Sequence, residues 1–229
     1  HIRIIAAASL FGIFLTATGG FSSLEHIPLR SVILVIAGTF VGIDIGESLF
    51  VLSLRYIDIS RAYPISCCSY PLITVVIAFF TLNEQLSAIA LAGVLLVLVG
   101  IYFIAFPNGP LWVRISIHSP EERKGLILLL LAAIAWGVSV IGIKLGAEGL
   151  EMPLANFIRF SGAAILLIPL TIIPWLRFRW DKAKWRNLGL ASLNGFLSFG
   201  IGAIFFLLAL RDAGAAITSV LSSTSPLFL

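Results

Sequence analysis

The chain has 229 residues, of which 59% are hydrophobic and 11% are charged, and its mean hydropathy is +1.09. A soluble domain of this size needs a charged surface, so this composition excludes an ordinary soluble protein and predicts a membrane protein. The net charge of +4 does not indicate nucleic-acid binding, because Lys and Arg lie mainly in short loops between apolar runs.

Apolar runs of about 20 residues, enough for a helix to cross the hydrocarbon core of a bilayer, follow one another along the chain. Gly, Pro or charged residues separate most of them. We expect eight helical segments, at residues 2–18, 31–54, 61–81, 87–106, 125–146, 154–175, 188–210 and 214–229. Because the chain starts with His1 at the edge of a run and ends inside another, we expect a portion of a longer protein. The adjacent Cys67 and Cys68 lack metal-ligand spacing, and we expect them only to pack, with no metal or cofactor.

An internal repeat relates the two halves of the chain at an offset of 156 residues. The offset pairs Arg3 with Arg159 and Gly46 with Gly202. The matching segments are 2–10 with 158–166, 52–55 with 208–211 and, one residue out of register, 68–72 with 223–227. Five helical segments separate the two starts, so the second copy should cross the membrane in the opposite direction. This is an inverted repeat, which places substrate near the bilayer midplane in transporters.

The repeat predicts the fold class and the domains. We expect an all-α membrane protein built from two five-helix units, with ten helices in the full protein and about eight in this chain. The first repeat should occupy residues 1–106 without its first helix, and the second residues 124–229 without its last helix. A loop at 107–123 joins them.

With these motifs in view, the chain resembles the EamA branch of the drug/metabolite transporter superfamily over nearly its whole length. The stretch 52–104 has the family's pattern of a proline-containing helix, a Glu after a short turn and a helix with two spaced glycines. The residues that carry the resemblance are Pro71, Glu84, Gly93 and Gly100 in the first repeat and Trp136, Arg159 and Pro226 in the second. The resemblance implies a ten-helix secondary carrier, often an exporter of amino acids, metabolites or toxic compounds.

The stretch GTFVGIDIGESLFVL (38–52) places two acids inside an apolar run. At 100° per residue, Gly38, Gly42 and Gly46 share one face of a helix, and Asp44 and Glu47 lie on the opposite face. Glycines spaced by four let another helix approach closely. An acid in the middle of a spanning helix costs about 2.5–3.5 kcal/mol if it faces lipid, so we expect the acidic face to line a cavity.

Two roles are open for Asp44 and Glu47, which are not a pair typical of the family as a whole. One carboxyl can bind a cationic or amino group of a substrate, or exchange it for a proton. Alternatively, both acids are protonated or hydrogen-bonded in a network between helices and take no part in transport. The repeat-related positions are Gly200 and Ala203, so the acidity belongs to one repeat only.

Further candidates for the cavity lie near prolines inside the helices. Tyr63, Ser66 and Ser222 could line the cavity, or their hydroxyls could bond only to the backbone of their own helix. Trp136 could be a substrate platform or a packing residue. The positions expected to be structural are Gly38, Gly42, Gly46, Pro71, Glu84, Arg159, Gly202 and Pro226.

The remaining charged residues also allow two readings. Arg3 and Arg159 begin their predicted helices, where they can reach the membrane interface or contact substrate. Lys144 can be a counter-ion for an acid or can reach the interface. Glu84 follows Asn83 at a helix start, where it can cap free N–H groups or act as a gate element.

These observations predict a secondary transporter that exports small organic metabolites, amino acids or drugs by alternating access, with proton coupling through Asp44 and Glu47. The alternatives are an intramembrane enzyme using these acids for acid–base chemistry, which we do not expect, and a non-transporting scaffold or channel. The expected partners are the bilayer, a small-molecule substrate, protons and a second copy of the chain, with no nucleic acid. The expected location is the plasma (inner) membrane of a prokaryote, spanned several times.

Overall fold

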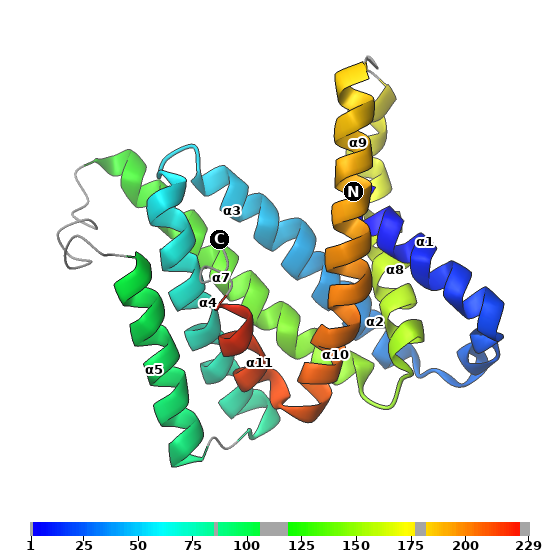
Figure 1. Cartoon of the computed structure of the whole chain (residues 1–229), viewed down its shortest axis with the longest axis horizontal. Coiled ribbons are helices and arrows are strands. Elements are labelled where there is room, and N and C mark those ends of the chain that lie inside the picture. Colours follow the sequence, from blue (N-terminus) through cyan, green and yellow to red (C-terminus); the bar gives the residue numbers. More distant parts are fainter. Residues whose placement is uncertain (1, 85–86, 106–118, 177–181, 225–229) are drawn as a thin grey trace. The chain divides into compact units, whose positions relative to one another are not determined.

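The computed structural model describes residues 2–84, 87–105, 119–176 and 182–224, which contain helices and turns but no β-strand (Figure 1). Eight helices follow one another in these ranges, at the positions that the apolar runs predict. Five are long and apolar enough to cross a membrane. Pro226 and most of the expected loop at 107–123 lie outside the described residues.

The first of two compact units consists of His1–Phe40 and Gly142–Asp212. Its elements are α1 (Ile2–Thr18), η1 (Gly20–His26), α2 (Leu29–Thr39), α8 (Met152–Leu176), α9 (Lys182–Asn194), η3 (Gly195–Ile201) and α10 (Gly202–Asp212). Helix α1 packs against α8 and η3, and α2 also packs against α8. The buried side chains of one core cluster are Leu15, Val35, Leu154 and Ile158.

The second unit consists of Val41–Ile141 and Ala213–Leu229. Its elements are η2 (Phe40–Gly46), α3 (Glu47–Ser53), α4 (Ile59–Leu82), α5 (Ala88–Ala105), most of α7 (Pro120–Ala147) and α11 (Gly214–Ser222). Helix α11 packs against α4 and α5, and α4 also packs against α5. Each unit takes helices from both halves of the sequence, so these spatial units differ from the expected repeats, whose boundaries stay a prediction.

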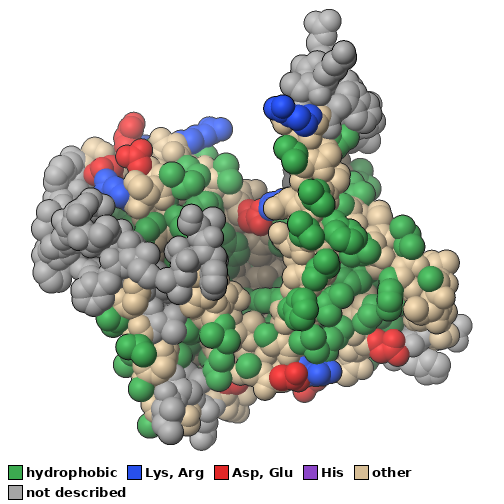
Figure 2. Space-filling view, viewed as in Figure 1, with side chains coloured by type: hydrophobic (Ala, Val, Ile, Leu, Met, Phe, Trp, Pro, Cys, Tyr) green, Lys and Arg blue, Asp and Glu red, His purple; other side chains and the backbone are tan. Residues whose placement is uncertain are grey.

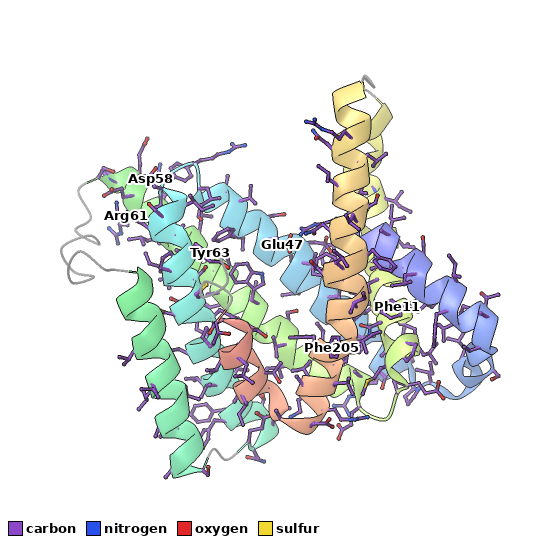
Figure 3. All side chains as sticks on the ribbon, in the orientation of Figure 1. Phe11, Glu47, Asp58, Arg61, Tyr63 and Phe205 are labelled. Atoms are coloured by element: carbon purple, nitrogen blue, oxygen red, sulfur yellow. The ribbon has the colours of Figure 1, made fainter. Side chains whose placement is uncertain are left out.

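On the face of the molecule drawn in Figure 2, hydrophobic side chains are spread over the surfaces of the helices, as is typical of helices that contact lipid. In the first unit, Phe205 is 65% exposed whereas Phe11 is 2% exposed (Figure 3). Phe80 on α4 of the second unit is 76% exposed. In a soluble protein such side chains would form the core, so their exposure indicates surfaces that face acyl chains.

Two of the eight helices contain a π-helical segment. The helix Leu29–Ser53 includes η2, and the last long helix includes η3 between α9 and α10. The segments start at residues 40 and 195, which is 155 residues apart and within one residue of the sequence offset. The two halves of the chain therefore share a local backbone irregularity at equivalent positions, which supports their origin as repeats.

Candidate functional site

The acidic pair lies where a π-helical segment meets an α-helix. Asp44 is within η2, and Glu47 is the first residue of α3 (Figure 3). A π-helix forms i→i+5 hydrogen bonds and has more residues per turn than an α-helix. The angle of 100° per residue therefore does not hold within η2, whereas Gly42 and Gly46 do share a face, because both lie against α7.

Both acidic side chains are half-buried in the second unit. The Oδ2 atom of Asp44 is buried and has no hydrogen-bond partner in the described part of the chain. A buried polar atom without a partner is unfavourable in a stable fold, so a proton, ion or polar group bound at Oδ2 would be stabilised there. Packing alone therefore does not explain the buried position of the Asp44 carboxyl group.

The glycines beside the acids let α7 approach closely. A Cβ atom added to Gly42 would collide with the side chain of Ser139, and one added to Gly46 would lie 2.8 Å from Cδ1 and Nε1 of Trp136. Gly38 in the first unit is also buried and lies against the backbone of α7. These contacts place α7 directly against the helix that carries the acids.

Trp136 packs against Gly46, the residue directly before Glu47, in the second unit. Its ring lies against Gly46, 5.7 Å from the ring centroid of Phe50 and 6.2 Å from that of Tyr70, which meets it edge-on at 83°. Rings at such distances stabilise one another beyond the area that they bury. Trp136 is therefore held from several sides, and its role as a substrate platform stays a prediction.

The two serine candidates, Ser66 and Ser222, lie in the second unit and donate hydrogen bonds to the backbone of their own helices. The Oγ of Ser66 donates to the carbonyl of Tyr63 at 2.7 Å, and the Oγ of Ser222 donates to the carbonyl of Thr218 at 2.8 Å. Ser66 is buried and Ser222 is exposed. Tyr63 lines a shallow pocket of about 380 Å³ at the first turns of α4, together with Ile59, Ser60 and Pro64.

Glu84 binds the start of α11, a helix far away in the sequence. Its Oε1 and Oε2 accept hydrogen bonds from the backbone N–H groups of Ala215 and Ala216, at 2.9 and 3.0 Å. These residues form the first turn of α11, 131 residues further along the chain. Glu84 therefore caps a helix start, that of α11, while its role at the start of α5 and its role as a gate element stay predictions.

The other motif positions have different environments. Pro71 is fully buried inside α4, and Gly202 is the first residue of α10. A Cβ atom added to Gly202 would lie 3.5 Å from the carbonyl of Leu197, an ordinary contact. Gly202 therefore does not mark a close helix approach of the kind seen at Gly46, its partner in the repeat.

Arg159 is buried instead of extending to the membrane interface. It lies two turns into α8 and is 4% exposed, so the expected interfacial anchor is wrong for this residue. Asn156, one turn earlier, is completely buried. The sequence reasoning did not single out Asn156. The only available signal was an amide side chain three residues before an Arg within an apolar run.

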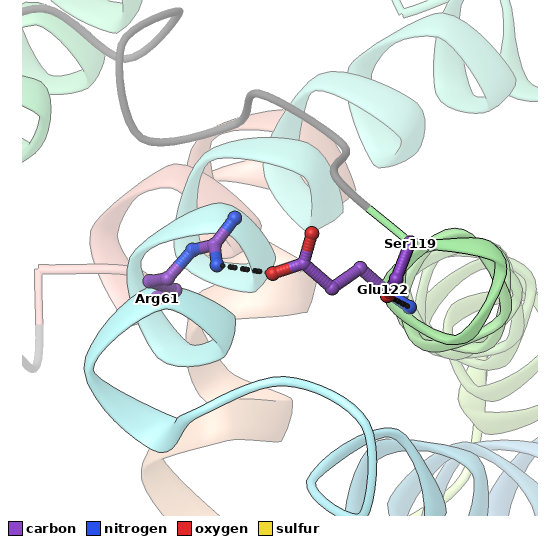
Figure 4. Close-up of polar contacts among 3 residues, drawn as sticks. All are labelled: Arg61, Ser119 and Glu122. Atoms are coloured by element: carbon purple, nitrogen blue, oxygen red, sulfur yellow. Dashed lines mark hydrogen bonds and ion pairs between the residues drawn. The ribbon is translucent and has the colours of Figure 1, made fainter.

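An ion pair joins α4 to the start of α7 in the second unit (Figure 4). The Nη1 atom of Arg61 lies 3.0 Å from Oε1 of Glu122, and the backbone N–H of Glu122 donates to Oγ of Ser119. Ser119 therefore caps α7, and the carboxylate of Glu122 lies in the first turn, where the helix dipole favours it. Neither Arg61 nor Glu122 is among the site residues predicted from the sequence.

An all-helical chain with five helices able to cross a bilayer and two acids inside one of them is an integral, multi-pass membrane protein. The sequence model of the EamA-like transporter family matches residues 1–106 and 123–229, and the chain belongs to this family.

The chain has two further likenesses to known proteins. A stretch of 130 residues, 57% of the chain, is 32% identical to Uncharacterized protein PA1977 of Pseudomonas aeruginosa and spans 40% of that protein's length. One solved crystal structure shares 19% identity and superposes with a TM-score of 0.55 over 98% of this chain and 83% of the other. This second likeness shows the fold alone.

Proposed function

We propose that the protein is a secondary carrier that exports small organic metabolites, amino acids or drugs by alternating access. The observation that carries this proposal, within a transporter family, is the buried and unpartnered Oδ2 of Asp44 inside a spanning helix. A carboxyl group in such a place is unfavourable for folding and is kept where an ion or substrate uses it.

Asp44 and Glu47 act as the site of a proton or of a cationic group on the substrate. The Oδ2 of Asp44 has unused acceptor capacity, so it can take a proton or an ammonium hydrogen without breaking another bond. Glu47 begins α3 on the same helix and supplies a second half-buried carboxyl group. Binding of the substrate and of the proton would then compete at one place, which is the basis of exchange.

The two π-helical segments supply the conformational element. Short π-helical stretches inside α-helices occur frequently at functional sites because they alter the hydrogen-bond ladder locally. In carriers built from inverted repeats, equivalent parts of the two repeats move in alternation around the substrate. The equivalent placement of η2 and η3 supports such a movement. The plasma membrane of a prokaryote, as the location, and assembly with a second copy belong to the same proposal.

The test is transport by the full-length protein in proteoliposomes, with and without a pH gradient, using a panel of labelled amino acids and cationic drugs. Asp44→Asn and Glu47→Gln should each lower saturable transport at least tenfold while leaving thermal unfolding in detergent unchanged. Asp58→Asn and Glu121→Gln are the matched controls, because both side chains are exposed, and they should transport like the wild type.

Normal transport by both Asp44→Asn and Glu47→Gln would remove the acids from the mechanism. Absence of saturable transport for the whole panel would contradict the carrier proposal. Chemical conversion of a panel compound without its translocation would favour an intramembrane enzyme instead.

A further inference from the structure

The first unit contains a buried arginine, Arg159, that pairs with no acid among the described residues. Arg159 projects from α8, with Cζ 4.5 Å from the ring centroid of Phe160 and 5.9 Å from that of Phe206. Its Nε and Nη1 atoms are buried and have no hydrogen-bond partner among the described residues. The rings attract the positive charge at their faces, but they do not provide oxygen acceptors for these N–H groups.

Asn156 adds a second unpartnered polar group one turn away. It is 0% exposed, and both its Nδ2 and its Oδ1 lack hydrogen-bond partners in the described ranges. Residues three apart on an α-helix are neighbours on its surface, so the amide and the guanidinium share one side of α8. Asn156 and Arg159 thus bury four polar atoms that have no hydrogen-bond partner among the described residues. Such a concentration is rare in native folds.

The helices around these residues provide no carboxylate. Within the described residues of the first unit, α1, α2, α8, α9 and η3 contain no Asp or Glu. In α10 the only acid is Asp212, which is exposed and pairs with Arg211 at 2.7 Å. Glu148 and Glu151 are exposed near the turn between α7 and α8. A buried guanidinium without a counter-charge is unfavourable, so a bound anion would stabilise it.

A pocket lies along the same two helices. It has a volume of about 700 Å³ and is lined on α8 by Ala155 and on α10 by Leu207 and Leu210. Ala155 is one helical turn before Arg159 and directly before Asn156, and Leu207 follows Phe206, which contacts Arg159. Arg159 and Asn156 do not line this pocket, whose other walls are the turn between α7 and α8 with Lys144, Glu148 and Glu151. A small molecule in the pocket would lie about one helical turn of α8 from the two polar residues.

We propose that Arg159 and Asn156 form a buried subsite for the carboxylate of a small organic anion. The planar guanidinium binds a carboxylate through two parallel N–H···O bonds, which would use Nε and a terminal nitrogen. Nδ2 of Asn156 donates to the same carboxylate, and Oδ1 accepts a hydrogen from a neighbouring hydroxyl or ammonium group of the ligand. Phe160 and Phe206 contact its apolar part. This inference rests on the proposed carrier function and specifies the chemistry of its substrate.

Binding to the purified full-length protein in detergent tests the subsite without any transport measurement. Acetate and phenylacetate, with their neutral amides acetamide and phenylacetamide at equal ionic strength, are the probes, and inorganic phosphate is a third anion. The carboxylates should raise the unfolding temperature in a saturable way, while the amides should not. A ligand that binds only the folded state stabilises it in proportion to the logarithm of its concentration above Kd.

Arg159→Met and Asn156→Ala should each weaken carboxylate binding at least about tenfold, and Arg159→Lys should do so less because it keeps the charge but loses the planar fork. The unfolding temperature without ligand should stay the same or rise in Arg159→Met, because an unpartnered charge has been removed. Arg30→Met, at an exposed arginine of the same unit, is the matched control and should bind like the wild type.

No carboxylate-specific shift in the wild type, an equal shift with the amides, or an equal shift in Arg159→Met would overturn the subsite. A shift with phosphate alone would overturn the assignment to carboxylates. A loss of ligand-free stability in both Arg159→Met and Asn156→Ala would show that the two residues are structural. Specific carboxylate binding without transport in proteoliposomes would contradict the carrier proposal and support the subsite. Transport without specific carboxylate binding would support the carrier proposal and overturn the subsite.

Discussion

Glu84 accepts a hydrogen bond from the backbone N–H of Ala215 at 2.9 Å, and thereby ties the end of α4 to the start of α11. Its second oxygen accepts from the next N–H group, so one carboxylate satisfies two of the free donors of the helix. The negative charge also lies at the positive end of the helix dipole. Two helices far apart in the sequence are therefore joined in the second unit by a single side chain.

Replacing Glu84 should destabilise the second unit. Glu84→Ala leaves two N–H donors of α11 without their partner, and we expect the free energy of unfolding to fall by about 1–3 kcal/mol. Glu84→Gln keeps one acceptor oxygen and should lose roughly half as much. Chemical unfolding in detergent measures both changes. Asp58→Ala is the control, because Asp58 precedes α4 but makes no side-chain cap, and an equal loss there would contradict the capping role.

Gly214→Ala should be unfavourable for two separable reasons. Gly214 has φ +86°, and a Cβ atom there would lie 2.9 Å from Oε1 of Glu84. The left-handed backbone alone costs an alanine about 1–2 kcal/mol, and the contact with the carboxylate adds to it. In a Glu84→Ala background only the backbone contribution should remain, so the loss caused by Gly214→Ala should shrink.

The matched control for Gly214→Ala is Gly93→Ala on α5. Among the described residues, no atom outside its own helix lies within 4 Å of a Cβ atom there, so this change should be neutral or stabilise by up to about 1 kcal/mol. An equal effect of Gly214→Ala in the presence and absence of Glu84 would show that the carboxylate does not contact the added methyl group.

Helix positions could be predicted from the sequence because the bilayer fixes their length. The expected segment 2–18 coincides with α1, and 87–106 differs from α5 by one residue at each end. The π-helical segments could not be predicted. Apolar residues lie on most sides of these helices, so the hydrophobic pattern does not show where the backbone changes from i→i+4 to i→i+5 hydrogen bonds.

The site could be predicted only in part, because the sequence shows which residues are unusual in an apolar run but not which distant residues they contact. An acid inside an apolar run is conspicuous, so Asp44 was singled out by composition. Glu84 stands at a turn, and the sequence does not show that its acceptors serve a helix 131 residues away. Arg159 lies near the start of its run, where reaching the interface is common, and only the packing of α8 shows that it is buried.

Gly46→Ala should disturb the packing behind the acidic pair. The new Cβ atom would lie 2.8 Å from two atoms of the Trp136 ring, which is itself held by Phe50 and Tyr70. Overpacking of this kind costs about 1–3 kcal/mol, measurable as a lower unfolding temperature. Trp136→Phe should restore part of the loss in the double variant, because the smaller ring leaves room for the methyl group.

Gly100→Ala controls for the helix propensity of the added methyl group in the Gly46 experiment. In the part of the chain that the structure describes, no atom outside its own helix lies within 4 Å of a Cβ atom at Gly100, so we expect no loss of stability. Equal unfolding temperatures for Gly46→Ala and the wild type would show that Trp136 moves without penalty, and that the close contact between η2 and α7 is not required.

The ion pair between Arg61 and Glu122 should contribute modestly to stability. The side chains are 23% and 24% exposed, so solvent screens their attraction, and we expect a coupling energy of about 0.2–1 kcal/mol. A double-mutant cycle with Arg61→Met and Glu122→Gln measures it by chemical unfolding at low salt. The coupling should decrease at 1 M salt, where the Debye length is only about 3 Å. The pair Arg211 and Asp212, which is 64% and 63% exposed, is the control and should show a smaller coupling. A coupling that does not change with salt would indicate packing of the Arg61 side chain instead of charge attraction.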